Sequence, residues 1–254
     1  MDAYTSFASV YDTFMDEIPY GAWCEYLTDI LQKQGIRDGL ILDLGCGTGT
    51  LTELLSAKGY DMIGVDNAEE MLNIAMSKKE KSGADILYLL QDMREFELYG
   101  TVKAVISVCD SLNYLLEEDE LLQTFKLVNN YLDPDGLFIF DFNTVYKYEV
   151  VIGDTTIAED REDCSFIWDN FYHEEEELNE YDLTLFVKEK GDLYRKMVET
   201  HFQRGYRLEQ MKKLVEQAGM VFVSACDADT HGEVNEESER IYVIAREQGK
   251  KQNK

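Results

Sequence analysis

Short apolar runs alternate with stretches of helical character along most of this chain, and this alternation limits the possible folds most strongly. Strands are expected at residues 40–44, 62–65, 86–90, 102–108 and 137–142. Helices are expected between them at 51–58, near 71–75 and at 118–131, with two more before the first strand. Buried strands that alternate with helices form parallel sheets covered on both faces. The sequence therefore predicts an α/β fold with a doubly wound, mostly parallel sheet.

The alternation stops between residues 146 and 205. Helical periodicity is absent there, and the runs at 165–171, 183–188 and 196–202 are rich in residues that favour strands. Helical character returns at 208–218, and strands at 220–225 and 241–245 bring the main sheet to seven. We expect a core of residues 1–145 and 206–247, an inserted antiparallel β annex at 146–205 and a disordered tail at 248–254.

The charge of the chain argues against several classes of partner. Its 254 residues include 24 lysines and arginines but 51 aspartates and glutamates, which gives a formal net charge of −27. Such a chain would repel nucleic acids and anionic membranes. No apolar run is long enough for a transmembrane helix, and the N-terminus lacks the features of a signal peptide. We therefore expect a cytoplasmic protein that binds neither nucleic acid nor membrane.

The cysteines and histidines show no spacing typical of a metal site or a disulfide framework. The five cysteines are odd in number and form no CxxC pair, and the three histidines are scattered. We expect no bound metal.

The first predicted strand runs directly into a glycine-rich loop, residues 43–49, with the sequence Asp-Leu-Gly-Cys-Gly-Thr-Gly. Glycines allow a ligand to approach the backbone closely, and loops at the carboxyl ends of such strands bind ligands. A dinucleotide fingerprint needs its third glycine one position later, where this chain has Thr50. The Asp43 carboxylate would repel a pyrophosphate but would suit a cationic ligand. Asp66, after the second strand, can accept hydrogen bonds from a ribose in either case.

Three segments together resemble the successive motifs of class I S-adenosylmethionine-dependent methyltransferases: residues 43–49, 64–66 (Gly-Val-Asp) and 91–93 (Gln-Asp-Met). The resemblance covers roughly residues 1–145 and 206–246. It implies a Rossmann-like core that binds S-adenosyl-L-methionine. The residues that it implies for cofactor binding are Tyr11, Asp43, Gly45, Cys46, Gly47, Gly49, Asp66, Met71, Asp92, Met93, Cys109 and Asp110.

The resemblance gives these residues different parts of the cofactor. Asp43 and the glycine loop would hold the methionine portion, Asp66 the ribose, and Asp92 with Met93 the edge of the adenine. Met71 would lie against the adenine face, although its helical spacing fits ordinary core packing as well. The N-terminal segment 4–12 resembles a cofactor lid, and the core face of a helix remains the alternative for Tyr11.

The methyl acceptor is expected above the carboxyl ends of the fourth and fifth strands, where the annex can cover the same opening. The candidates for lining its site are Tyr4, Asn113, Tyr114, Asn143, Trp168, His173 and His201. The two annex histidines are candidate bases because imidazole titrates near neutrality, while a surface or hairpin position is the alternative for each. The aromatic residues of the annex, Trp168 included, also suit a small core of its own.

Annexes of this kind resemble those of small-molecule methyltransferases, including glycine, sarcosine, sugar and polyketide types. The resemblance implies methyl transfer to a nitrogen or oxygen of a small-molecule acceptor. Three alternatives stay open: a tRNA or protein methyltransferase, a non-catalytic cofactor-binding regulator, and an NAD(P)-linked oxidoreductase. The sequence identifies no obligatory catalytic residue, because S-adenosylmethionine is already an activated methyl donor.

Overall fold

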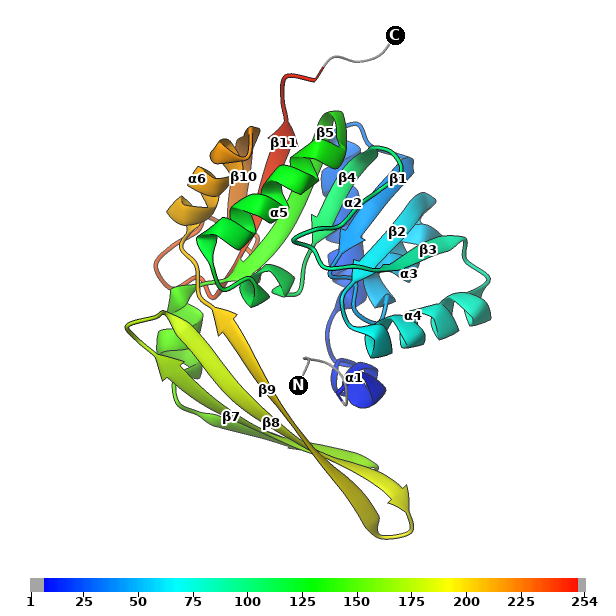
Figure 1. Cartoon of the computed structure of the whole chain (residues 1–254), viewed down its shortest axis with the longest axis vertical. Helices are drawn as coiled ribbons and strands as arrows, with labels where there is room; N and C mark the ends of the chain where they lie inside the picture. Colours follow the sequence, from blue (N-terminus) through cyan, green and yellow to red (C-terminus); the bar gives the residue numbers. More distant parts are fainter. Residues whose placement is uncertain (1–6, 251–254) are drawn as a thin grey trace.

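A seven-stranded sheet forms the centre of the protein in the computed structural model, which describes residues 7–250 (Figure 1). The strand order is β10-β11-β5-β4-β1-β2-β3. Five neighbouring strands are parallel: β1 (Gly39–Leu44), β2 (Tyr60–Asp66), β3 (Ile86–Leu90), β4 (Val102–Ser107) and β5 (Leu132–Asn143). Two strands, β10 (Met220–Asp227) and β11 (Arg240–Glu247), form an antiparallel edge. The predicted doubly wound, mostly parallel sheet is confirmed.

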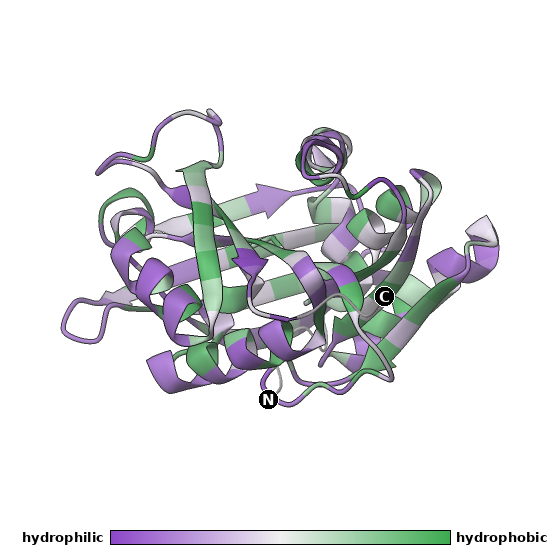
Figure 2. Ribbon diagram, turned by 90° about the horizontal axis from the view of Figure 1, so that it is seen from above, coloured by the Kyte–Doolittle hydropathy of each residue, from purple (hydrophilic) through white to green (hydrophobic). Residues whose placement is uncertain are grey.

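Helices cover both faces of this sheet. The helices are α2 (Tyr20–Lys33), α3 (Thr50–Ala57), α4 (Glu69–Ser82), α5 (Glu118–Tyr131) and α6 (Leu208–Gln217). Successive side chains of a strand point to opposite faces. In β5, Phe138 and Phe140 therefore pack in one core layer with α5 and α6, whereas Leu137 and Ile139 pack in the other with α2 and α3. Figure 2 shows the hydrophobic strands between helices whose outer faces are hydrophilic.

The annex forms a second, four-stranded antiparallel sheet at the carboxyl edge of the main sheet (Figure 1). Its strands are β6 (Thr156–Asp160), β7 (Cys164–His173), β8 (Leu178–Lys190) and β9 (Leu193–Arg204). A tight turn joins β8 to β9, and Gly191 has a φ of 60° there. The predicted antiparallel annex is confirmed, and its strands are longer than the predicted runs. The edge strand β6 and the short helix η2 (Lys147–Ile152) were not predicted.

Helix α1 (Ala8–Phe14) lies between the annex and the core. Its residues Val10 and Phe14 share a hydrophobic cluster with Phe166 of the annex, and the Phe14 and Phe166 rings meet edge to face at 4.8 Å. On another side, Ala8 packs against Met71 of α4. A helix of 7 residues is unstable in isolation, so these contacts hold it in place.

Two earlier expectations concern residues that the structure does not describe. Tyr4 lies outside the described residues, and so do residues 251–254 of the expected tail. Within residues 7–250, no helix has the length and apolar character needed to cross a membrane.

Candidate functional site

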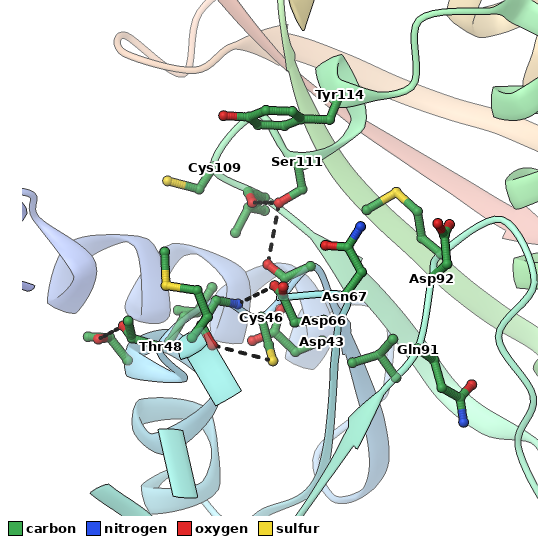
Figure 3. A pocket seen from close by; sticks show the side chains of 18 of the residues that line it. Asp43, Cys46, Thr48, Asp66, Asn67, Gln91, Asp92, Cys109, Ser111 and Tyr114 are labelled. Atoms are coloured by element: carbon green, nitrogen blue, oxygen red, sulfur yellow. Dashed lines mark hydrogen bonds between the residues drawn. The ribbon is translucent and has the colours of Figure 1, made fainter. Parts of the chain in front are cut away.

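A cavity lies at the carboxyl ends of the parallel strands, and the glycine loop after β1 forms part of its wall (Figure 3). Gly45 and Gly47 have φ values of 82° and 54°, in the left-handed region that favours glycine. A Cβ on Gly47 would have no atom within 4 Å, so the loop presents bare backbone to the cavity. The cavity, measured out to its open mouth, holds about 1150 Å³. This volume includes open solvent at the mouth, so a ligand can enter the cavity from outside.

The carboxylate of Asp43 lies beneath this loop and is only 3% exposed. The Thr52 hydroxyl donates a hydrogen bond of 2.6 Å to its Oδ2 atom. Burial raises the pKa of Asp43 to about 7, the charge of Asp66 adds to that rise, and the bond from Thr52 opposes it. A cation bound beside Asp43 would favour the ionised form.

Asp66 connects the glycine loop to the end of β2. Its Oδ2 atom accepts a hydrogen bond of 2.8 Å from the Gly47 N–H, and its Oδ1 atom accepts one of 2.9 Å from the Ala68 N–H. Burial raises the pKa of this carboxyl as well. Asp66 therefore fixes the turn before α4 and lines the cavity at the same time.

The segment after β3 contributes Asp92 and Met93 to the cavity. The Arg94 guanidinium donates to both oxygens of Asp92, at 2.9 Å and 2.6 Å, and holds the pKa of that carboxyl below its usual range. Arg94 also pairs with Glu120 at the start of α5, at 2.6 Å. The Asp92 carboxylate is thus ionised and held in position.

Met71 and Tyr11 form the side of the cavity next to α1. Met71 is 2% exposed and packs in the cluster that includes Ala8 and Tyr11. Met71 therefore packs in the core and lines the cavity at the same time, so both interpretations of its position apply.

The turn after β4 brings Cys109 to the cavity in an unusual backbone conformation. Cys109 and Asp110 have φ values of 67° and 53°. Their N–H groups donate to the buried Asp141 carboxylate, at 3.0 Å and 2.8 Å, which stabilises this strained turn. Burial raises the pKa of the Cys109 thiol to about 12, so it is protonated at neutral pH and is a poor nucleophile.

Most of the predicted cofactor-binding residues come together in this cavity. Those that line it are Tyr11, Asp43, Gly45, Cys46, Gly47, Asp66, Met71, Asp92, Met93 and Cys109. Gly49 does not, because it is the N-cap of α3, and a side chain there would collide with the Tyr88 hydroxyl. Asp110 does not either, because its carboxylate turns to Gln203 of the annex and to Arg240.

Three described residues of the core were predicted to line the acceptor site, and only one of them lines the cavity. Tyr114, at the end of the short helix η1 (Ser111–Tyr114), lines the cavity. Asn113 and Asn143 do not. The Asn143 N–H donates to Asn113 Oδ1, and Asn113 Nδ2 donates to the Asn143 carbonyl oxygen, both at 2.9 Å. This pair ties η1 to the end of β5.

The predicted acceptor residues of the annex lie outside the cavity lining. Trp168 packs against Tyr181 within the annex, with ring centroids 4.8 Å apart. His173 is exposed and pairs with Glu180 at 2.9 Å. His201 is buried, and its Nδ1 atom lies 3.1 Å from the hydroxyl of Tyr114, which does line the cavity.

Sequence reasoning missed several lining residues, including Tyr20, Thr48, Asn67 and Arg94. Thr48 lies inside the glycine loop and Asn67 directly follows Asp66, so their positions within the motifs were a usable signal. Tyr20 reaches the cavity from α2, and no local pattern marks it.

Proteins named as methyltransferases are similar to this chain in sequence and in fold. A family model described as a methyltransferase domain matches residues 41–136. A Bacillus subtilis protein named "Putative methyltransferase YqeM" is 37% identical over 95% of this chain and 96% of its own length. The crystal structure of an S-adenosylmethionine-dependent methyltransferase from Clostridium acetobutylicum is 28% identical, with a TM-score of 0.87 over 98% of this chain and 100% of that chain.

A more distant relative has a more specific name. The dTDP-3-amino-3,4,6-trideoxy-alpha-D-glucopyranose N,N-dimethyltransferase of Streptomyces venezuelae is 29% identical over 53% of this chain and 56% of its own length. Similarity to the Bacillus and Clostridium proteins therefore spans core and annex together, whereas similarity to the Streptomyces enzyme covers about half of each chain.

Proposed function

This chain belongs to the class I S-adenosylmethionine-dependent methyltransferases, and we propose that it methylates a nitrogen or oxygen atom of a small-molecule acceptor. The observation that carries the proposal is the placement of Tyr114. This residue lines the cofactor cavity and also contacts the buried inner face of the annex. The acceptor would lie at this junction, enclosed by the core, α1 and the annex.

The residues of the cavity fit S-adenosylmethionine. The buried Asp43 carboxylate suits the ammonium group of the methionine portion, and the bare backbone at Gly47, where a Cβ would meet no atom within 4 Å, leaves room for it. Asp66 would accept from the ribose hydroxyls, because each of its oxygens has a lone pair beyond the backbone bond that it already accepts. Asp92 would accept from the adenine amino group.

S-adenosylmethionine supplies a methyl group on a positively charged sulfur that keeps the bonding electron pair when the methyl group leaves. The contribution of the protein is to position the acceptor and exclude water. Helix α1 serves both purposes, because Tyr11 lines the cavity while Phe14 packs on the annex. The annex, residues 146–205, would thus act as the substrate cap of the core.

Two further observations support a small acceptor. The net charge of −27 opposes binding of tRNA, which would need a local basic surface. The distant Streptomyces relative acts, by its name, on an amino sugar nucleotide. The methylated atom of the proposed acceptor is a nitrogen or an oxygen.

Two experiments test the proposal. Calorimetric titration should show binding of S-adenosylmethionine and S-adenosylhomocysteine and no binding of NADH. The protein with methyl-labelled cofactor should then transfer label to members of a panel of small amines, amino sugars, phenols and alcohols. Label found only in tRNA or protein substrates would contradict the proposal, and cofactor binding without transfer to any acceptor would favour a regulatory protein.

A further inference from the structure

The inner face of the annex carries a row of buried polar side chains beside the cavity. On β9, the alternate residues Glu199, His201 and Gln203 are 3%, 2% and 4% exposed. Alternation along a strand places them on one face of the sheet. Burial of polar groups costs free energy unless each is hydrogen-bonded, and an apolar row would cover the core at no such cost. The buried face of β9 therefore keeps polar side chains where apolar ones would cost less free energy.

Two members of this row connect to the cavity through Tyr114. The Nδ1 atom of His201 lies 3.1 Å from the Tyr114 hydroxyl, and its Nε2 atom lies 3.3 Å from Oε2 of Glu199. The Tyr181 ring stacks on the His201 ring with centroids 4.7 Å apart and planes inclined by 5°, so it fixes the imidazole plane. The chain of contacts runs from the cavity wall to a buried carboxylate.

The hydrogen bonds of this chain are consistent with one direction of donation. Glu199 accepts from the Phe7 N–H at 2.9 Å through Oε1, and through Oε2 it can accept from a proton on His201 Nε2. Nδ1 of His201 is then an acceptor for the Tyr114 hydroxyl. The Tyr181 hydroxyl, 2.8 Å from that of Tyr114, can donate to the Tyr114 oxygen.

We propose that Tyr114, His201 and Glu199 form a proton relay that removes the proton of the methyl acceptor. Tyr114 would be the catalytic residue in contact with the acceptor, and His201 and Glu199 would act through it. The acceptor would then be a nucleophile that enters with a proton, such as an alkylammonium nitrogen or a hydroxyl oxygen. This inference rests on the proposed function and specifies its substrate class.

The step balances without any further reactant. The electron pair that loss of the proton leaves on the acceptor would form the new bond to the methyl carbon, and the carbon–sulfur bond would break with its electron pair on sulfur. The acceptor proton passes to the Tyr114 oxygen as the Tyr114 proton moves to His201 Nδ1. The resulting imidazolium is stabilised by Glu199 and returns its proton to water after the product leaves.

The titratable groups around His201 come from several elements of the described residues. They are Tyr114 from η1, Tyr181 from β8 and Glu199 from the same strand. The charge of Asp110, in the turn between β4 and η1, acts on Tyr181. The neighbouring element α1 is preceded by Phe7, whose backbone N–H contacts Glu199. The Glu199 carboxylate, 3.3 Å from His201 Nε2, therefore lies where it would stabilise a positive charge formed on the ring during the step.

The first test measures the relay without needing an acceptor. The chain has 3 histidines, so the nitrogen resonances of His201 can be assigned by NMR in the full-length protein loaded with S-adenosylhomocysteine. We expect a proton on Nε2 alone at about pH 7.5. Tyr114→Phe should shift the Nδ1 resonance, whereas His173→Gln should leave it unchanged. A proton found on Nδ1, or on both nitrogens, would overturn the relay. So would an Nδ1 resonance that is unchanged in the Tyr114→Phe variant.

The second test uses an acceptor identified in the panel. Tyr114→Phe and His201→Gln should lower kcat about a hundredfold, while KM for S-adenosylmethionine stays within about twofold. His173→Gln, a matched change at an exposed histidine–glutamate pair, should behave as wild type.

The outcomes separate failure of the relay from failure of the proposed function. If His201→Gln and Tyr114→Phe retain wild-type kcat, the enzyme is a methyltransferase without this relay. If no small acceptor is methylated but the NMR result is as expected, the arrangement of protons stands and the acceptor class is wrong. Unchanged affinity of each variant for S-adenosylhomocysteine shows that the variant is folded.

Discussion

Asp43 lies where β1 enters the glycine loop. Burial disfavours the negative charge of its carboxylate, and a cationic ligand bound beside it would favour that charge. The side chain is 3% exposed, and burial raises its pKa to about 7. The nearby charge of Asp66 raises the pKa of Asp43 further. At the scale of single residues, the cavity is therefore prepared for positive charge on its ligand.

The ionisation of Asp43 predicts how cofactor affinity depends on pH. The ligand requires the carboxylate, so a proton must leave whenever the pH is below about 7. Apparent affinity for S-adenosylhomocysteine should fall about tenfold for each pH unit below 7 and level off at higher pH. Calorimetry across this range measures the effect. Asp43→Asn should lower the affinity and flatten the profile, whereas Asp61→Asn, at an exposed site in β2, should keep it. A flat wild-type profile would refute this explanation.

The glycines of the loop should respond differently to substitution. Gly47→Ala places a methyl group in open cavity space, so it should weaken cofactor binding and cost about 1–2 kcal/mol of stability for its left-handed backbone. Gly49→Ala adds a collision with Tyr88 to a similar backbone cost, so it should lower the melting temperature more. Thermal unfolding with and without S-adenosylhomocysteine compares the two. Equal loss of stability in both variants would show that the distinction is wrong.

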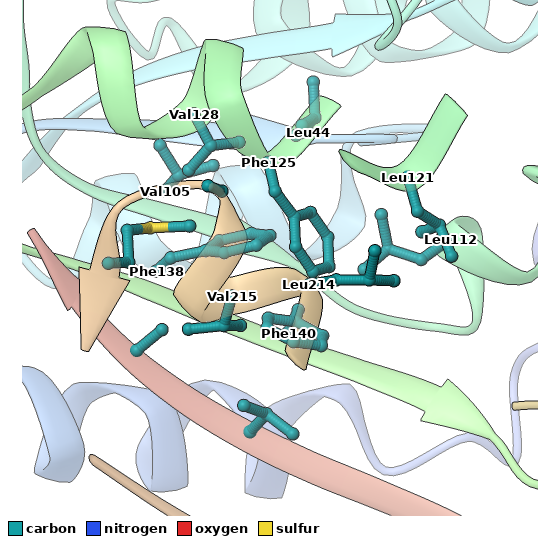
Figure 4. Close-up of a cluster of buried hydrophobic side chains, with 14 of the residues drawn as sticks. Leu44, Val105, Leu112, Leu121, Phe125, Val128, Phe138, Phe140, Leu214 and Val215 are labelled. Atoms are coloured by element: carbon teal, nitrogen blue, oxygen red, sulfur yellow. The ribbon is translucent and has the colours of Figure 1, made fainter. Parts of the chain in front are cut away.

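At the scale of elements, the sequence predicted the core well because each strand has a clear pattern. In β5, alternate aromatic and aliphatic residues face the two helical layers, and Figure 4 shows Phe138 and Phe140 packed with Phe125 and Leu214. The cofactor motifs were equally readable because they are local to single strand ends. The annex was harder, since the contact of His201 with Tyr114 joins residues 87 apart and depends on tertiary docking. Strand β6 is short and exposed, so no apolar pattern marked it.

Helix α1 should couple the annex to cofactor binding. Phe14→Ala removes the ring that packs on Phe166 and leaves Tyr11 without a fixed helix. Affinity for S-adenosylhomocysteine should fall several-fold, and backbone amides of residues 8–14 should exchange faster, while the main sheet stays protected. Met76→Ala, at an exposed position of α4, serves as the control. Unchanged amide exchange in α1 would contradict the proposed coupling.

Arg240 of β11 connects the strand ends beneath the acceptor region. It donates to Asp110 at 2.7 Å, and its guanidinium lies 3.8 Å from Asp141, which is fully buried. Arg240→Met leaves Asp141 buried without this cation and should cost about 3–5 kcal/mol of unfolding free energy near neutral pH.

The pH dependence of this loss has a definite sign. Burial raises the pKa of Asp141 and Arg240 lowers it, so in the variant the folded protein should bind a proton more tightly than the unfolded chain. The deficit should therefore shrink as the pH falls. Urea unfolding at about pH 8 and pH 5.5 measures this. Arg246→Met, on the same strand, is the control, and a deficit independent of pH would contradict the role of Asp141.

At the scale of the whole molecule, the net charge of −27 bears on both stability and partners. Repulsion among the carboxylates opposes compaction, while the site itself depends on a few buried carboxylates that salt screens less. We therefore expect the surface charge to oppose binding of polyanions without disturbing the cavity.

Salt should therefore stabilise the protein, and RNA should not bind it. The melting temperature should rise between about 0.01 M and 0.5 M sodium chloride as repulsion is screened. Fluorescence anisotropy with bulk tRNA at about 0.15 M salt should show no binding. Micromolar affinity for tRNA that weakens with added salt would reveal a basic surface and would contradict the proposed acceptor class.

The most direct test of the account is a crystal structure of the protein with S-adenosylhomocysteine. We predict that its ammonium group contacts Asp43, its ribose contacts Asp66, and its adenine lies near Asp92. The sulfur should then face Tyr114 and the annex across open space large enough for an acceptor. A sulfur atom turned away from Tyr114, or a cofactor bound outside this cavity, would contradict both the proposed function and the relay.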